Sequence, residues 1–427
     1  MKKPLSFALL LAALLLPVAI RAADGVSWKW QADLVPDLGF DLDAAQVVHV
    51  TSLEAKGDGS LAEALKMKGP RIVVFDVGGV IDLGMKGLDL REPQLVVAGQ
   101  TAPKPGITLI RGGLRIFGDQ TLVQHLRVRP GDAGQAKRSG WSPDGISTAG
   151  GPVDVWIDHC SVTWALDEQI SASTYKSPTG EPARRIFIRD CIIAEGLNDA
   201  SHPKGPHAKG TLVFGGTQHV AIVGNLYSSN VERNPVFQAG TSGVVVNNVI
   251  ANPGERAIHA HAANEASPNF PNARIAVVGN VVLFGEKSKR AGGVFEGLAE
   301  AFVKGNEGYD WLGESIPEVR PPSTATLTEP PVWPAGLTAR STTAALWHVA
   351  RFAGARPAER DAIDERIVRD ALIGAARIID SQEEVGGYPQ AEATTRQLEV
   401  PPTGRRAWLE KIAREVTLGP TASVSEK

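Results

Sequence analysis

Between Val155 and Ser171 the chain reads VWIDHCSVTWALDEQIS, and the first half of this stretch alternates with a period of two residues. Trp156 and every second residue after it would face one side of a strand, and the residues between them would face the other side. Two adjacent carboxylates, Asp167 and Glu168, follow this predicted strand. Paired acids at a strand end are a candidate site for a hard cation, although solvated turns carry such pairs as well.

Seven segments share one pattern, in which apolar or β-branched residues flank a single central position. Their fifth positions are 23 to 34 residues apart, and in the last four segments this position is Asn225, Asn248, Asn280 and Asn306. A period of this length is typical of a solenoid, in which each repeat forms one coil and longer repeats carry inserted loops. The segments begin at Leu122, Trp156, Phe187, Ala221, Val244, Ala276 and Phe302.

Stacked coils would bring the four asparagines into a ladder at one corner, because neighbouring parallel strands lie about 4.8 Å apart. Each Asn side chain would then satisfy backbone groups at a turn that no strand pairing reaches. Separate strand–helix–strand units are the alternative, but no amphipathic helical pattern lies between the segments. The repeat therefore predicts a solenoid of parallel strands.

Composition supports an all-β, turn-rich protein, because the 427 residues include 45 Gly and only 6% aromatic residues. The 44 basic and 47 acidic side chains leave a formal charge of −3, which gives no support for nucleic-acid binding. At the N-terminus, two lysines precede an apolar run from Leu5 to Ile20. We interpret residues 1–23 as a cleaved signal peptide rather than a membrane anchor, so the mature protein is expected to be secreted or periplasmic.

The two cysteines, Cys160 and Cys191, occupy the fifth positions of successive segments, so the same register places one above the other. Stacked thiols are near enough for a disulfide, and an exported protein permits one. Parallel strands offer a poor dihedral angle for that bond, however. Both the bonded and the free form stay open.

The pattern changes near Val319, where a Pro-rich, extended stretch precedes helical periodicity. We divide the mature chain into residues 24–318, a β-helix catalytic domain, and residues 319–427, a linker and helical extension. The extension is expected to pack on the β-helix, because it is too short to bury a good core alone. A short helix is expected at the end of Ser52–Leu65, and longer ones over Thr342–Arg351, Glu359–Ile379 and Arg406–Val416.

Side chains that could carry chemistry gather in the loops of neighbouring coils. Because successive coils stack, these side chains would share one face. Three acids and several bases on one face suit an anionic substrate bridged by a cation. Each residue alone has an ordinary explanation, such as a turn cap for Asp144 or an ion pair with Glu232 for Arg233. The candidates are Asp144, Asp167, Glu168, His202, Lys204, His207, Lys209 and Arg233.

Several stretches occur in a specific combination, namely VVAGQTAPKPGITL, LRVRPGD, WIDHCSVTWALDEQIS, HPKGPHAKGTLV, RNP, VVVNNV and IIDSQEEVGGYP. Together they resemble the pectate lyases of polysaccharide lyase family one, over about residues 47–390. The resemblance implies a right-handed parallel β-helix that cleaves α-1,4-linked polygalacturonate by β-elimination. A base would remove the proton at C5, the C4 oxygen would leave, and Ca²⁺ on the substrate carboxylate would stabilise the developing charge.

Carried over residue by residue, the resemblance assigns Asp144 and Asp167 to calcium binding. It assigns Lys209 to a substrate carboxylate and Arg233 to the role of catalytic base. A free guanidinium is protonated at ordinary pH, so this role requires the site to lower the pKa of Arg233. Lys209 is the alternative base, since the pKa of a lysine shifts more readily.

Two positions depart from the family pattern, because Ser171 stands in place of a further acid and Gln238 in place of a second arginine. Glu168 is expected to compensate as a third metal ligand, and Lys204 or His202 to replace the arginine. Weak calcium binding alone and tighter binding with pectate present are therefore expected. The predicted substrate-binding residues are Lys204, His202, His207 and Gln238.

Other functions fit the same fold. The protein could bind acidic glycans without cleaving them, or cleave another uronate polysaccharide or methylated pectin. A hydrolase would need two carboxylates placed around a water, and Asp167 and Glu168, as neighbours on a strand end, are expected to point apart. In each case we expect a monomer whose partner is an acidic polysaccharide.

Overall fold

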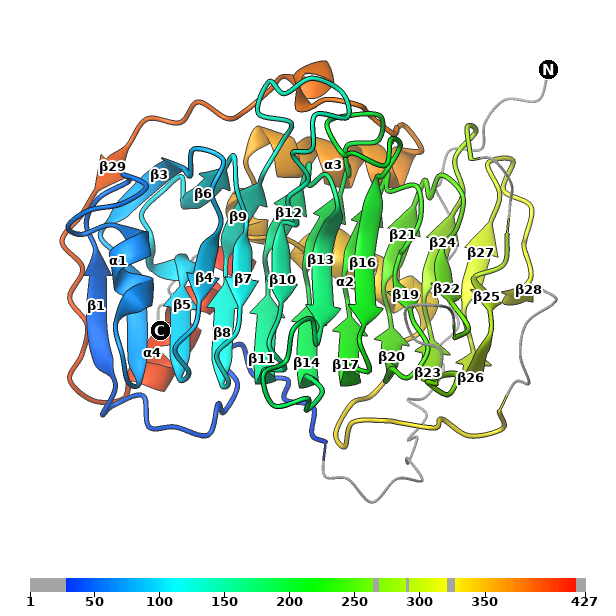
Figure 1. The fold of residues 1–427 in the computed structure, drawn as a ribbon, viewed down its shortest axis with the longest axis horizontal. Helices are drawn as coiled ribbons and strands as arrows, with labels where there is room; N and C mark the ends of the chain where they lie inside the picture. The colour runs from blue at the N-terminus through cyan, green and yellow to red at the C-terminus, as the bar shows by residue number, and fades with distance from the viewer. Residues whose placement is uncertain (1–27, 264–268, 289–291, 321–326, 420–427) are drawn as a thin grey trace, which may run out of the picture.

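The structure is a computed structural model that describes residues 28–263, 269–288, 292–320 and 327–419. Three sheets of parallel strands run the length of the molecule, and successive coils add a strand to each in turn (Figure 1). The protein is a right-handed parallel β-helix, as expected. The predicted signal peptide lies outside the described residues. Within the described part, no helix combines the length and apolarity needed to cross a bilayer.

Sheet A contains the repeated segments in the predicted register. Trp156 pairs with Leu122 on one side and with Phe187 on the other, and Val244 pairs with Ala221 and Ala276. The sheet consists of β1 (Gln46–Val50), β2 (Arg71–Phe75), β5 (Leu95–Ala98), β8 (Thr121–Gln124), β11 (Val153–Asp158), β14 (Arg184–Arg189), β17 (Gln218–Val223), β20 (Ser242–Val246), β23 (Ala273–Val278) and β26 (Ala299–Lys304).

A strand of sheet C follows each strand of sheet A except β1, and the antiparallel strand β29 extends one edge of sheet C. It consists of β3 (Val77–Asp82), β6 (Ile107–Ile110), β9 (Leu126–Arg129), β12 (Ser161–Thr163), β15 (Ile192–Ala194), β18 (Leu226–Ser228), β21 (Val249–Ala251), β24 (Val281–Leu283), β27 (Glu307–Tyr309) and β29 (Thr394–Thr395).

The corner between sheets A and C holds the predicted asparagine ladder. The Nδ2 of Asn225 donates to Oδ1 of Asn248 at 2.8 Å, and the same bond joins Asn248 to Asn280 at 3.0 Å and Asn280 to Asn306 at 2.9 Å. Cys191, one coil before the ladder, donates its backbone N–H to Oδ1 of Asn225 at 2.9 Å. Cys160 and Cys191 are stacked and buried, and both thiols are free.

Sheet B completes each coil and carries the candidate residues at the beginnings of its strands. Its inner face packs into the core between the three sheets through residues such as Ile146, Ile170 and Val213. It consists of β4 (Leu88–Leu90), β7 (Leu114–Ile116), β10 (Ile146–Thr148), β13 (Glu168–Ser173), β16 (Lys209–Phe214), β19 (Val236–Phe237), β22 (Ile258–Ala260), β25 (Phe295–Gly297) and β28 (Val319–Arg320).

Helices and terminal segments cover the outer faces of the other two sheets. Val349 and Ile367 pack on apolar side chains of sheet C, and Leu409 joins Trp28 in a cluster over sheet A. Among the described residues, no helix takes part in a comparable cluster on the outer face of sheet B. The helices are α1 (Leu61–Lys66), α2 (Thr342–Phe352), α3 (Ala362–Ile373) and α4 (Arg405–Leu418), with 3₁₀ turns at Gly99–Thr101, Pro357–Glu359 and Gln382–Val385.

The expected helix over Glu359–Ile379 is wrong at both ends. Asp361 caps the first turn of α3 by accepting from the N–H of Asp364, and Gly374 ends the helix in the left-handed conformation, with φ of 73°. Glycine adopts that conformation without steric cost. Beyond Gly374, residues 375–395, hereafter called the strap, cross the turns that follow strands of sheet C and include β29, which pairs with β3 (Figure 1).

Candidate functional site

The candidate residues lie at the amino ends of four adjacent strands of sheet B. Asp144 precedes β10, Glu168 begins β13, Lys209 begins β16 and Arg233 precedes β19. In the backbone pairing of the strands, Glu168 lies opposite Lys209, and Lys209 lies opposite Glu232. Because neighbouring parallel strands begin side by side, residues spread along the chain form one row on the face that the helices leave uncovered.

Three carboxylates meet at one end of this row. One oxygen each from Asp144, Asp167 and Glu168 lies within 4.8 Å of the other two. The expectation that Asp167 and Glu168 point apart is therefore wrong, because Asp167 still belongs to the turn before β13. An all-oxygen donor set of this kind fits a hard cation such as Ca²⁺.

The pKa of Asp144 is strongly raised in this site. Burial and the charge of Asp167 raise its pKa to about 7, against hydrogen bonds from Ser171 and Ser147. Its Oδ1 accepts the backbone N–H of Glu168 at 3.2 Å. Ser171, which stands in place of an expected acid, thus supports Asp144 through a neutral hydroxyl. A proton or a cation is needed to relieve the repulsion between these carboxylates.

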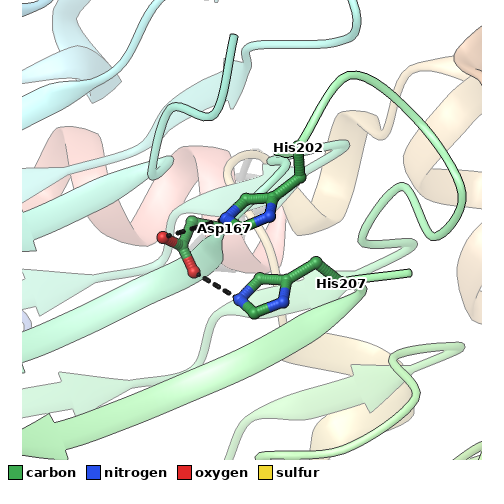
Figure 2. Close-up of side chains that lie close together, drawn as sticks. All are labelled: Asp167, His202 and His207. Atoms are coloured by element: carbon green, nitrogen blue, oxygen red, sulfur yellow. Dashed lines mark hydrogen bonds and ion pairs between the residues drawn. The ribbon is translucent and has the colours of Figure 1, made fainter. Parts of the chain in front are cut away.

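The side chains of two histidines, His202 and His207, contact the carboxylate of Asp167 (Figure 2). The Nε2 of His207 lies 2.9 Å from Oδ1 of Asp167, and the Nε2 of His202 lies 3.6 Å from Oδ2. The two rings are stacked, with centroids 3.8 Å apart. These contacts lower the pKa of Asp167 although burial opposes its ionisation. His202 and His207 therefore orient a carboxylate in this structure.

The tautomer of His202 makes it a hydrogen-bond donor toward Asp167. The backbone N–H of Lys204 donates to Nδ1 of His202 at 3.1 Å, so in the neutral ring the proton sits on Nε2. Burial and the neighbouring His207 lower the pKa of His202, which favours the neutral ring. Asp167, His202 and His207 also lie close enough to hold a metal, but Nε2 of His202 would first have to lose its proton. The oxygen cluster is the better cation site.

The two residues predicted to be catalytic, Lys209 and Arg233, are both paired with acids. Arg233 donates from Nη1 to Oε1 of Glu168, and Nζ of Lys209 lies 2.6 Å from Oε1 of Glu232. Burial lowers the pKa of Arg233, while the charges of Asp167 and Asp144 work in the opposite direction. Glu168 therefore joins the carboxylate cluster to the guanidinium.

The other predicted substrate-binding residues are dispersed. Lys204 is exposed on its loop, and His202 is engaged with Asp167. Gln238 follows β19, where its Nε2 lies 3.1 Å from Nδ1 of His261. The replacement of the missing arginine by Lys204 or His202 therefore stays a prediction without a supporting contact at Gln238.

Three polar residues of this row were not predicted as site residues from the sequence. Glu232 pairs with Lys209, and Arg256 and His261 flank β22, one coil beyond Arg233. The adjacency of Glu232 to Arg233 was a usable signal. Arg256 and His261 carry no recognisable motif, and only their place in the repeat, just before and just after an apolar segment, could have pointed to them.

No protein-family model and no curated protein sequence matches this chain. The major allergen of cedar pollen is similar in structure, with 14% identity and a TM-score of 0.49, over 72% of this chain and 88% of its own. A mutant pectate lyase of Bacillus subtilis is similar with 14% identity and a TM-score of 0.47, over 73% and 92% of the two chains. The pectate lyase of Bacillus sp. N165, solved with trigalacturonate, has 12% identity and a TM-score of 0.43, over 73% and 94%.

Proposed function

We propose that the protein is a pectate lyase of polysaccharide lyase family one, which cleaves polygalacturonate by calcium-assisted β-elimination. The observation that carries the proposal is the contact between the carboxylate cluster and Arg233 through Glu168, on the uncovered face of the β-helix. A cation site and a buried guanidinium side by side provide the two functions that elimination needs. On the basis of the N-terminal segment, we propose that this activity is secreted or periplasmic.

Asp144, Asp167 and Glu168 would hold the calcium ion, which when bound stabilises charge on the carboxylate of the reacting sugar. His202 and His207 keep Asp167 ionised and oriented. Lys209 supplies an ammonium group to bind a carboxylate, and its partner Glu232 would have to yield to that ligand.

Arg233 is the proposed base for the proton at C5. Its burial favours the neutral guanidine, and the ion pair with Glu168 favours the charged form. A cation that takes Glu168 as a ligand would remove that pair and so lower the pKa of Arg233 further. Lys209, whose Nζ lies 2.6 Å from Oε1 of Glu232, remains the alternative base.

Ultraviolet absorbance of polygalacturonate incubated with the purified protein, with calcium or with a chelator, tests the proposal. We expect absorbance from the new double bond with calcium and its loss with the chelator. An equal increase in absorbance with the chelator present would support the lyase activity and contradict the role of calcium. No increase on polygalacturonate, methylated pectin or another uronate polymer would leave a non-catalytic acidic-glycan-binding β-helix.

Inverting hydrolysis is the less favourable chemistry for this site. Inverting hydrolases hold their two carboxyl groups roughly 6.5–9.5 Å apart to admit a water, whereas the carboxylate oxygens here lie within 4.8 Å of one another. Product analysis separates the reactions, since only elimination leaves a double bond. A new reducing end without absorbance would overturn the lyase.

A further inference from the structure

We propose that Arg256 binds a second carboxylate of the polymer, one coil beyond Arg233, and that His261 and Gln238 position it. The inference rests on the proposed function, because it concerns a further sugar of the same acidic chain. It assigns a binding role to a residue that no sequence motif marks.

The first support is the place of Arg256 in the repeat. Arg256 lies two residues before β22, as Arg233 lies three residues before β19, and β19 and β22 are paired in parallel. Strands paired in this way are about 4.8 Å apart. Arg256 therefore continues the row that begins with the carboxylate cluster and passes through Lys209 and Arg233.

The backbone of Arg256 is fixed by the turn that carries Arg233. The N–H of Arg256 donates to the carbonyl oxygen of Val231 at 3.3 Å. The Nδ2 of Asn234 donates to the carbonyl oxygen of Arg256 at 2.9 Å. Because Val231 and Asn234 flank Arg233, the two arginines are held on one rigid unit.

The guanidinium of Arg256 is anchored along one edge and remains accessible. Its Nε lies 3.0 Å from Oε1 of Glu296, and the side chain is 41% exposed. It is also near the Lys209 pair, since the charge of Arg256 is among those that lower the pKa of Glu232, against the effect of burial. A substrate carboxylate that takes the place of Glu232 beside Lys209 would face the charges of both Lys209 and Arg256.

His261, oriented by Gln238, directs the lone pair of its Nε2 toward the guanidinium of Arg256. The Nη1 of Arg256 lies 3.5 Å from Nε2 of His261, and Nδ1 of His261 lies 3.1 Å from the amide of Gln238. Oxygen and nitrogen of a Gln amide are interchangeable assignments. Exchanging them lets Nδ1–H donate to Oε1, so the lone pair of Nε2 faces Arg256.

This arrangement accounts for the departure at Gln238. The family pattern implies an arginine at that position, and here Gln238 reaches an arginine of the next coil through His261. Lys204 and His202, the expected replacements, lie on a different loop, where His202 is bound to Asp167. Gln238 contacts His261, and His261 in turn contacts Arg256.

The test compares Arg256→Met with Arg274→Met, measuring affinity and kinetics on polygalacturonate and affinity alone for its methyl ester. Arg274 is a matched control, because it is 47% exposed and paired with Glu300 on sheet A. For Arg256→Met we expect KM and Kd for polygalacturonate to rise about ten- to hundredfold, with kcat changed less than about twofold. The values on the methyl ester, and those of Arg274→Met, should stay within about twofold.

A rescue variant keeps the test independent of folding. Gln238→Arg added to Arg256→Met should regain a large part of the lost affinity, because it restores a cation beside the same sugar. His261→Ala should raise KM less than Arg256→Met does, and leave kcat unchanged, as befits a positioning residue. Equal losses on the acidic and the methylated polymer, or no loss in Arg256→Met, would overturn the inference.

The outcome also separates this inference from the function on which it rests. If the wild-type protein neither cleaves nor binds polygalacturonate, the proposed function fails and the role of Arg256 fails with it. If the wild-type protein produces the unsaturated product and Arg256→Met has the same KM, only the role of Arg256 is overturned.

Discussion

Glu168 is the residue at which two requirements of the site compete. Its carboxylate is close enough to Asp144 and Asp167 to share a cation with them, and it also accepts a hydrogen bond from Arg233. A carboxylate that changes partner in this way would couple cation binding to the state of the guanidinium. Residue-scale predictions therefore concern Asp144, which the cation must neutralise, and Arg233.

In the metal-free protein, the free energy of unfolding should depend on pH through the ionisation of Asp144. Folding raises its pKa from 3.8 to about 7, so the folded state binds a proton more tightly than the unfolded state. The free energy of unfolding should therefore fall as pH rises between about 4 and 7. Urea titrations in a chelator at pH 5 and pH 8 measure this change, and Asp144→Asn should remove it.

Calcium affinity should show the opposite dependence on pH. Because a proton on Asp144 competes with the cation, affinity should weaken by up to about tenfold for each pH unit below 7. Calorimetric titration of calcium measures this effect. Equal pH slopes for the wild-type protein and Asp144→Asn would contradict the role of Asp144.

Arg233→Ala should separate turnover from binding. A general base contributes typically about 10²- to 10⁴-fold, so the rate of absorbance increase should fall by that factor. Affinity for polygalacturonate should change far less, because Lys209 is retained. Arg233→Ala should also tighten calcium binding, since Glu168 loses its competing partner. Unchanged turnover would remove Arg233 from the role of base.

At the scale of the elements, the asparagine ladder closes the corner between sheets A and C. The Oδ1 of Asn248 accepts from both the backbone N–H and the Nδ2 of Asn225, and its own Nδ2 donates to Asn280 and to the carbonyl oxygen of Ile222. All of these groups are buried, so none could turn to water. The ladder therefore fixes the stacking of the last four coils, the first of which carries Arg233.

Asn248→Ala should destabilise the protein by about 2–4 kcal/mol, because several buried donors and acceptors lose their partners together. Asn272→Ala is the control, since Asn272 lies outside the ladder, is exposed and has no left-handed backbone. It should cost about 1 kcal/mol or less. Chemical denaturation measures both values, and equal losses would contradict a special contribution of the ladder.

At the scale of the whole molecule, the C-terminal extension is part of the fold. Arg129 of sheet C donates to Asp361 and Asp364 at the start of α3, with Nη–Oδ distances of 2.7–3.1 Å. Beyond α3, the strap supports the loop of His202 and His207, because the backbone N–H of Asn198 donates to the carbonyl oxygen of Ile379 at 2.9 Å. The C-terminal extension therefore contacts the loop that carries His202 and His207, two residues of the candidate site.

Ile379→Ala should weaken both stability and calcium binding. Ile379 is fully buried in a cluster with Trp164, Leu166 and Leu197, so its truncation should cost about 2–5 kcal/mol. The loop that orients Asp167 would lose its support, and calcium affinity should fall with it. The control Ile373→Ala, at a side chain that is 67% exposed, should change each by less than about 0.5 kcal/mol. A stability loss without a change in calcium affinity would uncouple the strap from the site.

The coil register could be read from the chain because it depends on local alternation. Each segment carries its own inward and outward residues, so aligning Trp156 with Leu122 and Phe187 was enough to predict the pairs of sheet A. Asn225 and Asn248 were predictable for the same reason, since one buried polar residue per coil has few partners other than its own copy. The nearness of the acids to Lys209 and Arg233 followed from this stacking.

The partners within the site could not be read in this way, because they depend on how loops of unequal length return to sheet B. The loop of His202 and His207 turns back onto Asp167, and Glu168 faces Arg233 rather than solvent. Arg256 meets Gln238 through His261 only because β22 packs beside β19. Alternation is encoded residue by residue, whereas these contacts require long-range packing that places each loop above its neighbour.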